Sequence, residues 1–309
     1  MTSVAFISHA DCGFHDTGWG HPEHVGRLRA VTRALRNRPE LFMRVEHAEA
    51  RHATAAELAL AHDAAYVERV RAVVDAGGGR LDADTVASTG TWGAVTAGAG
   101  AVLDGVDMAM DGRAPRSFSA VRPPGHHALR AAPMGFCFFG NVAVAAHYAR
   151  QRHGVDRVLV IDWDVHHGNG TQALVEHEPS VRFVSMHQWP WYPGTGAAED
   201  RGPHGSVWNV PMGAALAPAR YAEALLRAVD DATRAWTPEL VILSAGFDCL
   251  RGDPLGGFTL ELEDIDRLTR ELVQRATAWC GGRLVSALEG GYAPDRVGEA
   301  SVVHLEALL

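Results

Sequence analysis

The segment from Asp162 to His167 (DWDVHH) places two carboxylates and two adjacent imidazoles directly after an apolar run, Val158–Ile161. Such a run is typical of a strand that is buried on both faces. Carboxylates at the end of a buried strand are costly unless hydrogen bonds or a metal compensate their charge. Asp164 and His166 lie two residues apart, so in extended chain their side chains point the same way. The segment therefore predicts a metal site.

A catalytic zinc needs a third protein ligand and an open position for water or substrate. Asp253, in the segment RGDPLGG, is the best remaining candidate. Taken alone, an aspartate between glycine and proline is more often a turn former. Beside the pair Asp164 and His166, ligation becomes the stronger interpretation. His167 is the weaker ligand candidate, because it points away from its neighbour.

A second pair of imidazoles, His126-His127, follows the Pro-Pro-Gly turn of RPPGHHA. A lone histidine is usually a surface residue or a satisfied core residue. An adjacent pair after such a turn indicates rings within hydrogen-bond reach of a metal-bound water. Imidazole titrates near neutrality, so one ring could take a proton from water and return it to a leaving amine. Each ring needs an orienting acceptor, and Asp162 and Asn169 are available.

Three aromatic residues are candidates for the substrate side of the site. Tyr292 follows Gly290-Gly291, and its phenol could donate a hydrogen bond to an oxyanion opposite the metal. A packing tyrosine is an equally weighted alternative. Phe136 and Tyr192 lie in the loops MGFCFFG and WYPGTG. They would suit the walls of a narrow tube for a linear side chain, unless they only plug their loops.

These residues must be brought together by elements that alternate between strand and helix. Candidate strands are Val4–Ser8, Ser117–Val121, Val158–Ile161, Arg182–Met186, Leu240–Ser244 and Arg283–Leu288, and candidate helices are Asn141–Arg152, Ala219–Trp236 and Leu262–Trp279. The alternation predicts an α/β fold with a central, mostly parallel sheet and helices on both faces. Four of the strands run into polar segments, and ligands bind outside the carboxyl ends of such strands. We therefore expect one site at this edge.

Composition and charge narrow the class of protein. The chain has 309 residues, 47% of them hydrophobic, and a formal net charge of −9, which argues against a nucleic-acid partner bound through its phosphates. No linker or low-complexity tract interrupts it, so we expect one catalytic domain over residues 1–309. Four widely spaced cysteines, no signal peptide and no apolar run of membrane-spanning length predict a cytoplasmic protein with no membrane partner.

The motifs, taken in order, resemble the histone deacetylase superfamily, most closely its class II and bacterial amidohydrolase-like members. The similarity covers nearly the whole chain and includes HPEHVGRL (21–28), RPPGHHA (122–128), GFCFFGN (135–141), DWDVHHGNGTQ (162–172), SMH (185–187), PGTG (193–196), GFD (246–248), GDPLGG (252–257) and LEGGY (288–292). The resemblance implies an arginase/deacetylase-like fold and a zinc-dependent deacetylase acting on acyl-lysine in proteins or peptides. Small N-acyl amines such as acetylpolyamines are the alternative substrates. Homo-oligomer formation and the native metal, zinc or ferrous iron, stay open.

Two cation sites are implied by the resemblance. Asp164, His166 and Asp253 would hold the zinc. A structural potassium ion would lie behind it, held by Asp162, Ser185 and the backbone carbonyls of Asp164, His166 and Met186.

The resemblance also implies roles in catalysis and substrate binding. His127 would be the general base and acid, and His126 would assist electrostatically while pairing with Asp162. Tyr292 would polarise the acyl carbonyl. The remaining pocket residues would be the carbonyl of Gly135, which accepts the substrate amide N–H, and the tunnel walls Phe136 and Tyr192.

Some positions depart from the pattern of the family. Asn169 stands where class I members carry an aspartate, which favours the class II side. Leu255 occupies the place of the glutamate gatekeeper of polyamine-selective relatives, so the resemblance favours acyl-lysine. Val25-Gly26 replaces a more usual Pro-Glu or Pro-Gln and leaves the rim of the entrance undefined. Asp82 and Asp84 are both candidates for a loop carboxylate that holds a peptide backbone.

Two further functions compete with hydrolysis of acyl-lysine. A catalytically silent acyl-lysine reader is disfavoured by the intact set of ligands, histidines and Tyr292. Ureohydrolysis of the arginase type shares the fold, but it needs a two-metal carboxylate cluster that this sequence does not complete.

Overall fold

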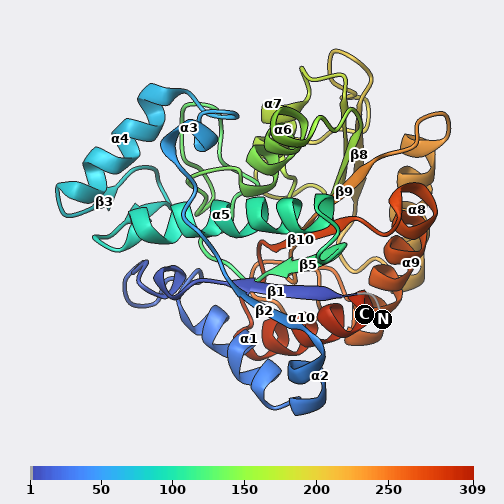
Figure 1. Ribbon diagram of the computed structural model, residues 1–309, viewed down its shortest axis with the longest axis horizontal. Coiled ribbons are helices and arrows are strands. Elements are labelled where there is room, and N and C mark those ends of the chain that lie inside the picture. The colour runs from blue at the N-terminus through green and yellow to red at the C-terminus, as the bar shows by residue number, and fades with distance from the viewer. Residues whose placement is uncertain (1–2) are drawn as a thin grey trace.

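A parallel sheet of eight strands forms the centre of the computed structural model, which describes residues 3–309 (Figure 1). The strands lie in the order β2-β1-β5-β10-β9-β6-β7-β8, and every neighbouring pair runs parallel. Their bounds are β1 Val4–Ser8, β2 Glu46–Glu49, β5 Arg116–Ser119, β6 Val158–Asp162, β7 Val181–Gln188, β8 Val207–Met212, β9 Leu240–Ala245 and β10 Leu284–Leu288. A short antiparallel pair, β3 (Gly79–Arg80) and β4 (Val86–Ala87), lies outside this sheet.

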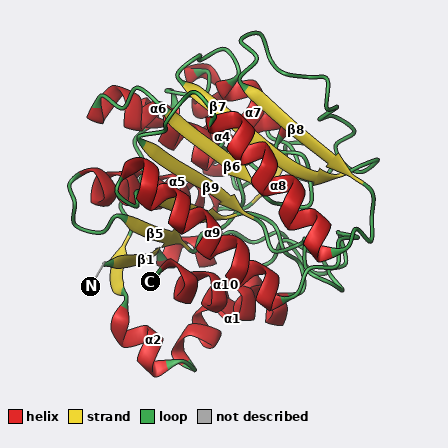
Figure 2. Ribbon diagram, turned by 90° about the vertical axis from the view of Figure 1, so that its right-hand side faces the viewer, coloured by secondary structure: helices red, strands yellow, loops and turns green. Residues whose placement is uncertain are grey.

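Helices cover both faces of the sheet, which confirms the predicted architecture (Figure 2). One apolar core joins the sheet to α1, α8, α9 and α10, and a second joins it to α4, α5, α6 and α7. The helices are α1 Gly26–Arg36, α2 Pro39–Arg44, α3 Ala55–Leu58, α4 Ala64–Asp75, α5 Thr91–Met110, α6 Asn141–His153, α7 Asn169–Val175, α8 Pro218–Thr233, α9 Leu262–Cys280, α10 Pro294–Leu308 and a 3-10 turn, η1, Ala10–Gly13. Within residues 3–309, no helix is long and apolar enough to cross a membrane.

Local signals in the sequence set the ends of two predicted helices. α8 begins at Pro218, where the missing N–H of proline costs no helical hydrogen bond. α9 begins with a capping box between Glu261 and Asp264, in which each side chain accepts the backbone N–H of the other. It ends at Gly281, whose φ of 66° is in the left-handed region that favours glycine. These helices begin and end close to the predicted residues.

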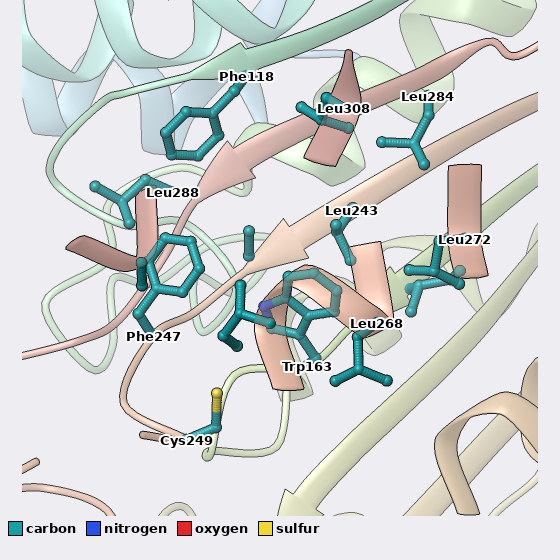
Figure 3. Packing of buried hydrophobic residues seen from close by; sticks show 14 of the residues in the cluster. Phe118, Trp163, Leu243, Phe247, Cys249, Leu268, Leu272, Leu284, Leu288 and Leu308 are labelled. Atoms are coloured by element: carbon teal, nitrogen blue, oxygen red, sulfur yellow. The ribbon is translucent and has the colours of Figure 1, made fainter. Parts of the chain in front are cut away.

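The core between the sheet and α9 anchors the chain around the functional segment. Trp163 follows β6 directly and is fully buried, in a cluster with Phe118 of β5 and Phe247 beyond β9 (Figure 3). Burial of the large apolar ring of Trp163 stabilises the fold, although its indole N–H has no hydrogen-bond partner among the described residues. Because Trp163 points into the core, its neighbours Asp162 and Asp164 are held in place at the edge of the sheet.

The predicted strands are all present, although their ends differ by a few residues. Ser117–Val121 ends at Ser119, ahead of the Arg122-Pro123-Pro124 turn, since proline has no N–H to donate to a sheet. The two edge strands were not predicted. β2 reads EHAE and is largely exposed, and β8 contains Pro211, so neither forms an apolar run.

The buried histidine His304 leads to a prediction about stability and pH. Its ring accepts a hydrogen bond from Thr269 and donates one to Ser286, whose own hydroxyl donates to the Ser117 carbonyl. Burial lowers the pKa of His304 to about 3. In the unfolded chain the pKa of a histidine is about 6.5. Between about pH 6.5 and pH 3, the unfolded state therefore binds a proton on His304 and the folded state does not, so the free energy of unfolding falls as the pH falls.

We expect this one residue to lower the free energy of unfolding by about 2 kcal/mol between pH 7 and pH 5. Urea unfolding at both pH values would measure the change. The His304→Gln variant is the matched control, and its free energy of unfolding should fall less over the same interval. Equal slopes for the variant and the wild type would contradict the prediction.

Candidate active site

Three ionisable side chains cluster at the carboxyl ends of β6 and β9. Asp164 and His166 follow β6, and Asp248 follows β9, its neighbour in the sheet. Their possible ligand atoms all lie within 4.8 Å of one another, and all three residues are buried. His166 Nδ1 is 3.0 Å from Asp164 Oδ1 and 3.3 Å from Asp248 Oδ2. This is a donor set of two carboxylates and one imidazole, which suits a divalent transition metal.

Hydrogen bonds fix the carboxylates of this cluster but leave one oxygen free. Asp164 accepts the backbone N–H of His166 at 2.9 Å and that of Gly290 at 2.8 Å. Asp248 Oδ1 accepts the N–H of Val165 at 2.9 Å, whereas its buried Oδ2 accepts no well-aligned hydrogen bond. Burial and the nearby Asp164 carboxylate raise the pKa of Asp248 to about 7. A buried oxygen without a donor needs a cation to compensate its charge, so the cluster fits a metal.

The predicted third ligand, Asp253, lies outside the group of three whose ligand atoms fall within 4.8 Å of one another, so its ligation stays a prediction and Asp248 is a second candidate for the third ligand. Backbone N–H groups occupy both oxygens of Asp253: Oδ1 accepts from Leu255 at 2.9 Å, and Oδ2 accepts from Tyr292 at 2.6 Å and Ala293 at 3.2 Å. These hydrogen bonds orient the Asp253 carboxylate, and Oδ1 keeps a lone pair for a metal, as do the oxygens of Asp164, which also accept backbone N–H groups. Asp248 lies three residues beyond β9, close to the sheet edge, and this position is the sequence signal that makes it a second candidate.

Each ring of the His126-His127 pair has the orienting partner that the sequence predicts. His126 Nδ1 lies 3.0 Å from Asp162 Oδ2, and His127 Nδ1 lies 2.7 Å from Asn169 Oδ1. An amide oxygen can only accept, so Nδ1 of His127 carries the proton. His127 Nε2 therefore keeps a lone pair, and the ring borders the pocket described below.

The two histidines differ in the direction of their pKa shifts. Burial opposes charge on His126, but Asp164 and Asp162 outweigh it and raise the pKa well above the ordinary value. Burial and the neighbouring His126 lower the pKa of His127 well below the ordinary value. The pair thus combines a cationic ring with a neutral one.

A buried carboxylate that was not predicted, Glu289, holds the backbone of this pair. Its Oε2 accepts the N–H groups of Gly125 at 2.6 Å and His126 at 3.2 Å, and its Oε1 accepts the Ser244 hydroxyl at 3.1 Å. Burial raises the pKa of Glu289 to about 7. The residue joins β9, β10 and the Pro-Pro-Gly turn, and only the folded chain brings these three segments together.

The HPEHVGRL and RPPGHHA segments meet in a buried ion cluster. Arg122 donates to both carboxylate oxygens of Glu23, at 2.8 and 2.7 Å, and Arg27 donates to the same side chain at 3.1 Å. Burial opposes ionisation of Glu23, but Arg122 and Arg27 outweigh it and lower the pKa to about 2. Arg27 also lies 5.0 Å from the ring centre of Tyr292 and fixes the first loop against the site.

A pocket of about 240 Å³ opens above the cluster. It contains every predicted tunnel residue together with Asp84, one of the two candidate loop carboxylates, and Trp191; its lining is Asp84, His127, Gly135, Phe136, His166, Trp191, Tyr192, Leu255 and Tyr292. The rings of Phe136 and Tyr292 are 5.7 Å apart, and those of His127 and Tyr192 are 5.1 Å apart. Of the two loop aspartates, Asp84 is the one at the pocket.

The surroundings of two pocket residues restrict the residue type at position 135 and the protonation state of Tyr292. Gly135 has a φ of +57°, and a Cβ atom there would lie 2.4 Å from the His127 ring, so only glycine fits. Tyr292 is buried, and burial raises the pKa of its phenol well above the ordinary value, although Arg27 opposes the shift. The phenol therefore keeps its proton and can act as a hydrogen-bond donor.

The predicted potassium ligands lie on neighbouring strands behind the cluster. Asp162 of β6 and Ser185 of β7 are partners in the sheet register, and Met186 follows Ser185 in the buried part of β7. The weaker ligand candidate, His167, instead contacts Thr195 at 2.8 Å and Gln172 at 3.0 Å.

Comparison with known proteins identifies the family. The chain matches the histone deacetylase domain over residues 21–308 and belongs to this family. It is 37% identical to the histone deacetylase-like amidohydrolase of Pseudomonas aeruginosa, over 94% of this chain and 77% of that protein. It is also 37% identical to polyamine deacetylase HDAC10 of Homo sapiens, over 99% of this chain but only 48% of that protein. The crystal structure of the HDA15 HD domain matches at a TM-score of 0.93 and 34% identity, covering 99% of this chain and 88% of that chain.

Proposed function

We propose that this hydrolase of the histone deacetylase family is a zinc-dependent deacylase, which releases acetyl or other acyl groups from the ε-amine of lysine in proteins or peptides. One observation carries the proposal: a single pocket is lined by His127, by His166 of the candidate metal cluster and by Tyr292. A metal-binding group, a proton acceptor and a hydrogen-bond donor are the parts that amide hydrolysis needs.

Asp164 and His166 would hold the zinc ion, with Asp253 or Asp248 as the third ligand. With three protein ligands, zinc keeps a coordination position open. When bound, zinc would polarise the acyl carbonyl and lower the pKa of a water molecule. Ferrous iron is the alternative metal, because imidazole and carboxylate donors suit it as well. Asp162, Ser185 and the backbone carbonyls of Asp164, His166 and Met186 would hold a potassium ion.

His127 moves the proton in the proposed reaction. Its Nδ1–H donates to Asn169, so Nε2 is free to accept a proton from water and to return it to the departing amine. His126, which Asp162 holds, supports the negative charge that develops nearby. Gly135 offers its carbonyl to the substrate amide, while Phe136 and Tyr192 enclose the linear side chain.

The phenol of Tyr292 would donate a hydrogen bond to the oxyanion that forms from the acyl carbonyl. We expect Tyr292→Phe to lower kcat by about 10²–10³-fold, because one oxyanion donor is lost from a buried site. Steady-state kinetics with metal analysis would test this, and zinc content should be unchanged. A loss of less than a few fold would rule out this role.

The identity of the amine depends on the entrance of the pocket. Leu255 presents an apolar side chain there, which suits the uncharged stem of a lysine. Small acylamines are the second candidate, since one relative of this chain is a polyamine deacetylase. A polyamine carries a further ammonium group, and within the pocket lining only Asp84 offers a carboxylate to receive it.

We place the activity in the cytoplasm, because the four cysteines are buried and unpaired.

A substrate panel tests the proposal. Purified protein, with its metal content measured, is assayed on acetyl-lysine peptides and on acetylspermidine, and we expect kcat/KM to be higher for the peptides. Turnover of acetylspermidine alone would overturn the assignment to lysine, whereas no turnover of any amide with full metal content would overturn the hydrolase itself.

The Leu255→Glu variant sharpens this comparison. A carboxylate at this position would attract a second ammonium group, so the ratio of kcat/KM for acetylspermidine to that for the peptide should rise, by about tenfold for each 1.4 kcal/mol of added attraction. The isosteric control Leu255→Gln should leave the ratio closer to that of the wild type.

A further inference from the structure

Two histidines and an aspartate outside the proposed reaction meet at the far edge of the sheet. His9 directly follows β1, Asp11 lies in η1, and His52 lies between β2 and α3. β1 and β2 are adjacent and parallel, so the segments that follow them emerge side by side. One possible ligand atom from each of the three side chains lies within 4.8 Å of the others.

The distances within this group favour a shared cation. His52 Nε2 lies 3.3 Å from Asp11 Oδ2, and His9 Nδ1 lies 3.8 Å from Asp11 Oδ1. The two imidazole rings are 4.7 Å apart and nearly perpendicular. Glu49, at the end of β2, adds an exposed carboxylate 3.7 Å from His9 Nε2.

The hydrogen bonds of Thr96 define the tautomer of His52. When the Thr96 hydroxyl donates to the Trp92 carbonyl at 2.8 Å, its oxygen accepts the hydrogen bond from His52 Nδ1, also at 2.8 Å; the reverse pairing, in which Thr96 donates to Nδ1 and Nε2–H donates to Asp11, would give up the Trp92 bond. Nδ1 therefore carries a proton, and neutral His52 has its lone pair on Nε2. That lone pair faces the carboxylate of Asp11, so two acceptors oppose each other. A metal ion between them would satisfy both acceptors.

We propose that His9, Asp11 and His52 form a second metal site, which binds a divalent transition metal such as zinc, cobalt or nickel. The imidazole nitrogens disfavour calcium and magnesium, which prefer oxygen ligands. A ligating histidine usually donates its other ring N–H to a fixed acceptor, as His52 does to Thr96. His9 brings a second imidazole to the same position, although its Nδ1 also caps η1 by accepting the Asp11 N–H.

The two histidines are not equal as ligands. Asp11 N–H already donates to His9 Nδ1 at 3.0 Å, and this contact competes with a metal. His52 has no such competitor on Nε2 among the described residues, so His52 and Asp11 are the stronger pair. A bound ion would join the segments after β1 and β2 to α5, which carries Thr96.

Metal titration of the whole protein tests the site. We expect wild-type protein to bind two equivalents of zinc, one at the active site and one here. His52→Ala and Asp11→Asn should each lose one equivalent while keeping deacylase activity. The control His177→Ala changes an exposed histidine, with 76% of its side chain accessible, and should keep both equivalents.

Two further variants separate this proposal from the proposed function. Asp248→Ala should lose the other equivalent and keep this one, whatever reaction the active site performs. Thr96→Val removes the acceptor of His52, together with the hydroxyl's bonds to the Trp92 and Gly93 carbonyls, and should weaken the second equivalent by about 10–100-fold.

Wild-type protein that binds one equivalent, with His52 doubly protonated at pH 7 by nuclear magnetic resonance, would overturn the proposal in favour of a simple ion pair. Retention of both equivalents by His52→Ala would overturn it as well. The wild-type stoichiometry decides the matter even if a variant fails to fold.

Discussion

The Asp248→Asn variant should lose the active-site metal and lower kcat/KM by roughly 10³-fold. Metal ions supply several kcal/mol of transition-state stabilisation, and each 1.4 kcal/mol changes a rate tenfold. Asparagine keeps an oxygen that can accept the Val165 N–H but removes the charge that a cation needs. Metal content after dialysis and steady-state kinetics on one acyl-lysine peptide would measure both effects.

Asp253→Asn is the matched control for this variant, because the two aspartates lie five residues apart near the same pocket. The Asp253 carboxylate accepts three backbone N–H groups, including that of Tyr292, so the change should cost stability, about 1–3 kcal/mol, rather than metal. If Asp253→Asn lost the metal and Asp248→Asn retained it, the assignment from the sequence would be right and the geometric assignment wrong.

The centre of the sheet could be predicted because its strands are buried on both faces. β6 and β9 are apolar runs that end abruptly in polar residues, and this pattern needs no knowledge of the rest of the chain. The edges could not be predicted in this way. β2 and β8 have one open edge each, so polar residues and Pro211 are tolerated and the apolar signal disappears.

The residues of the candidate site also differ in how far the sequence alone predicts them. Asp162, Asp164 and His166 are adjacent in sequence to a recognisable strand, so their proximity could be predicted. Asp248 obeys the same rule at β9 and is a second candidate for the third ligand, whereas Asp253 lies in the Gly-Asp-Pro turn and its ligation stays a prediction. Glu289 could not be assigned from the sequence, because its importance arises from contacts with Gly125, His126 and Ser244 that exist only after folding.

The His127→Ala variant should reduce kcat by about 10²–10⁴-fold, the range over which a positioned general base and acid contributes. The imidazole is the group in the pocket whose orientation leaves a free lone pair, since Asn169 holds Nδ1. Because His127 is not in the group of Asp164, His166 and Asp248, the metal content should not change. Single-turnover kinetics with metal analysis would separate a loss of proton transfer from a loss of metal.

Asn169→Ala provides the graded comparison, because it leaves the imidazole in place and removes only the acceptor that orients it. Its kcat should fall less, by about 10–100-fold, as expected when an orienting partner is lost. A similar loss in both variants would mean that the tautomer and orientation of His127, rather than its presence, limit the reaction. Near-wild-type kcat in His127→Ala would instead exclude His127 as the base and leave His126 as the remaining imidazole of the pair.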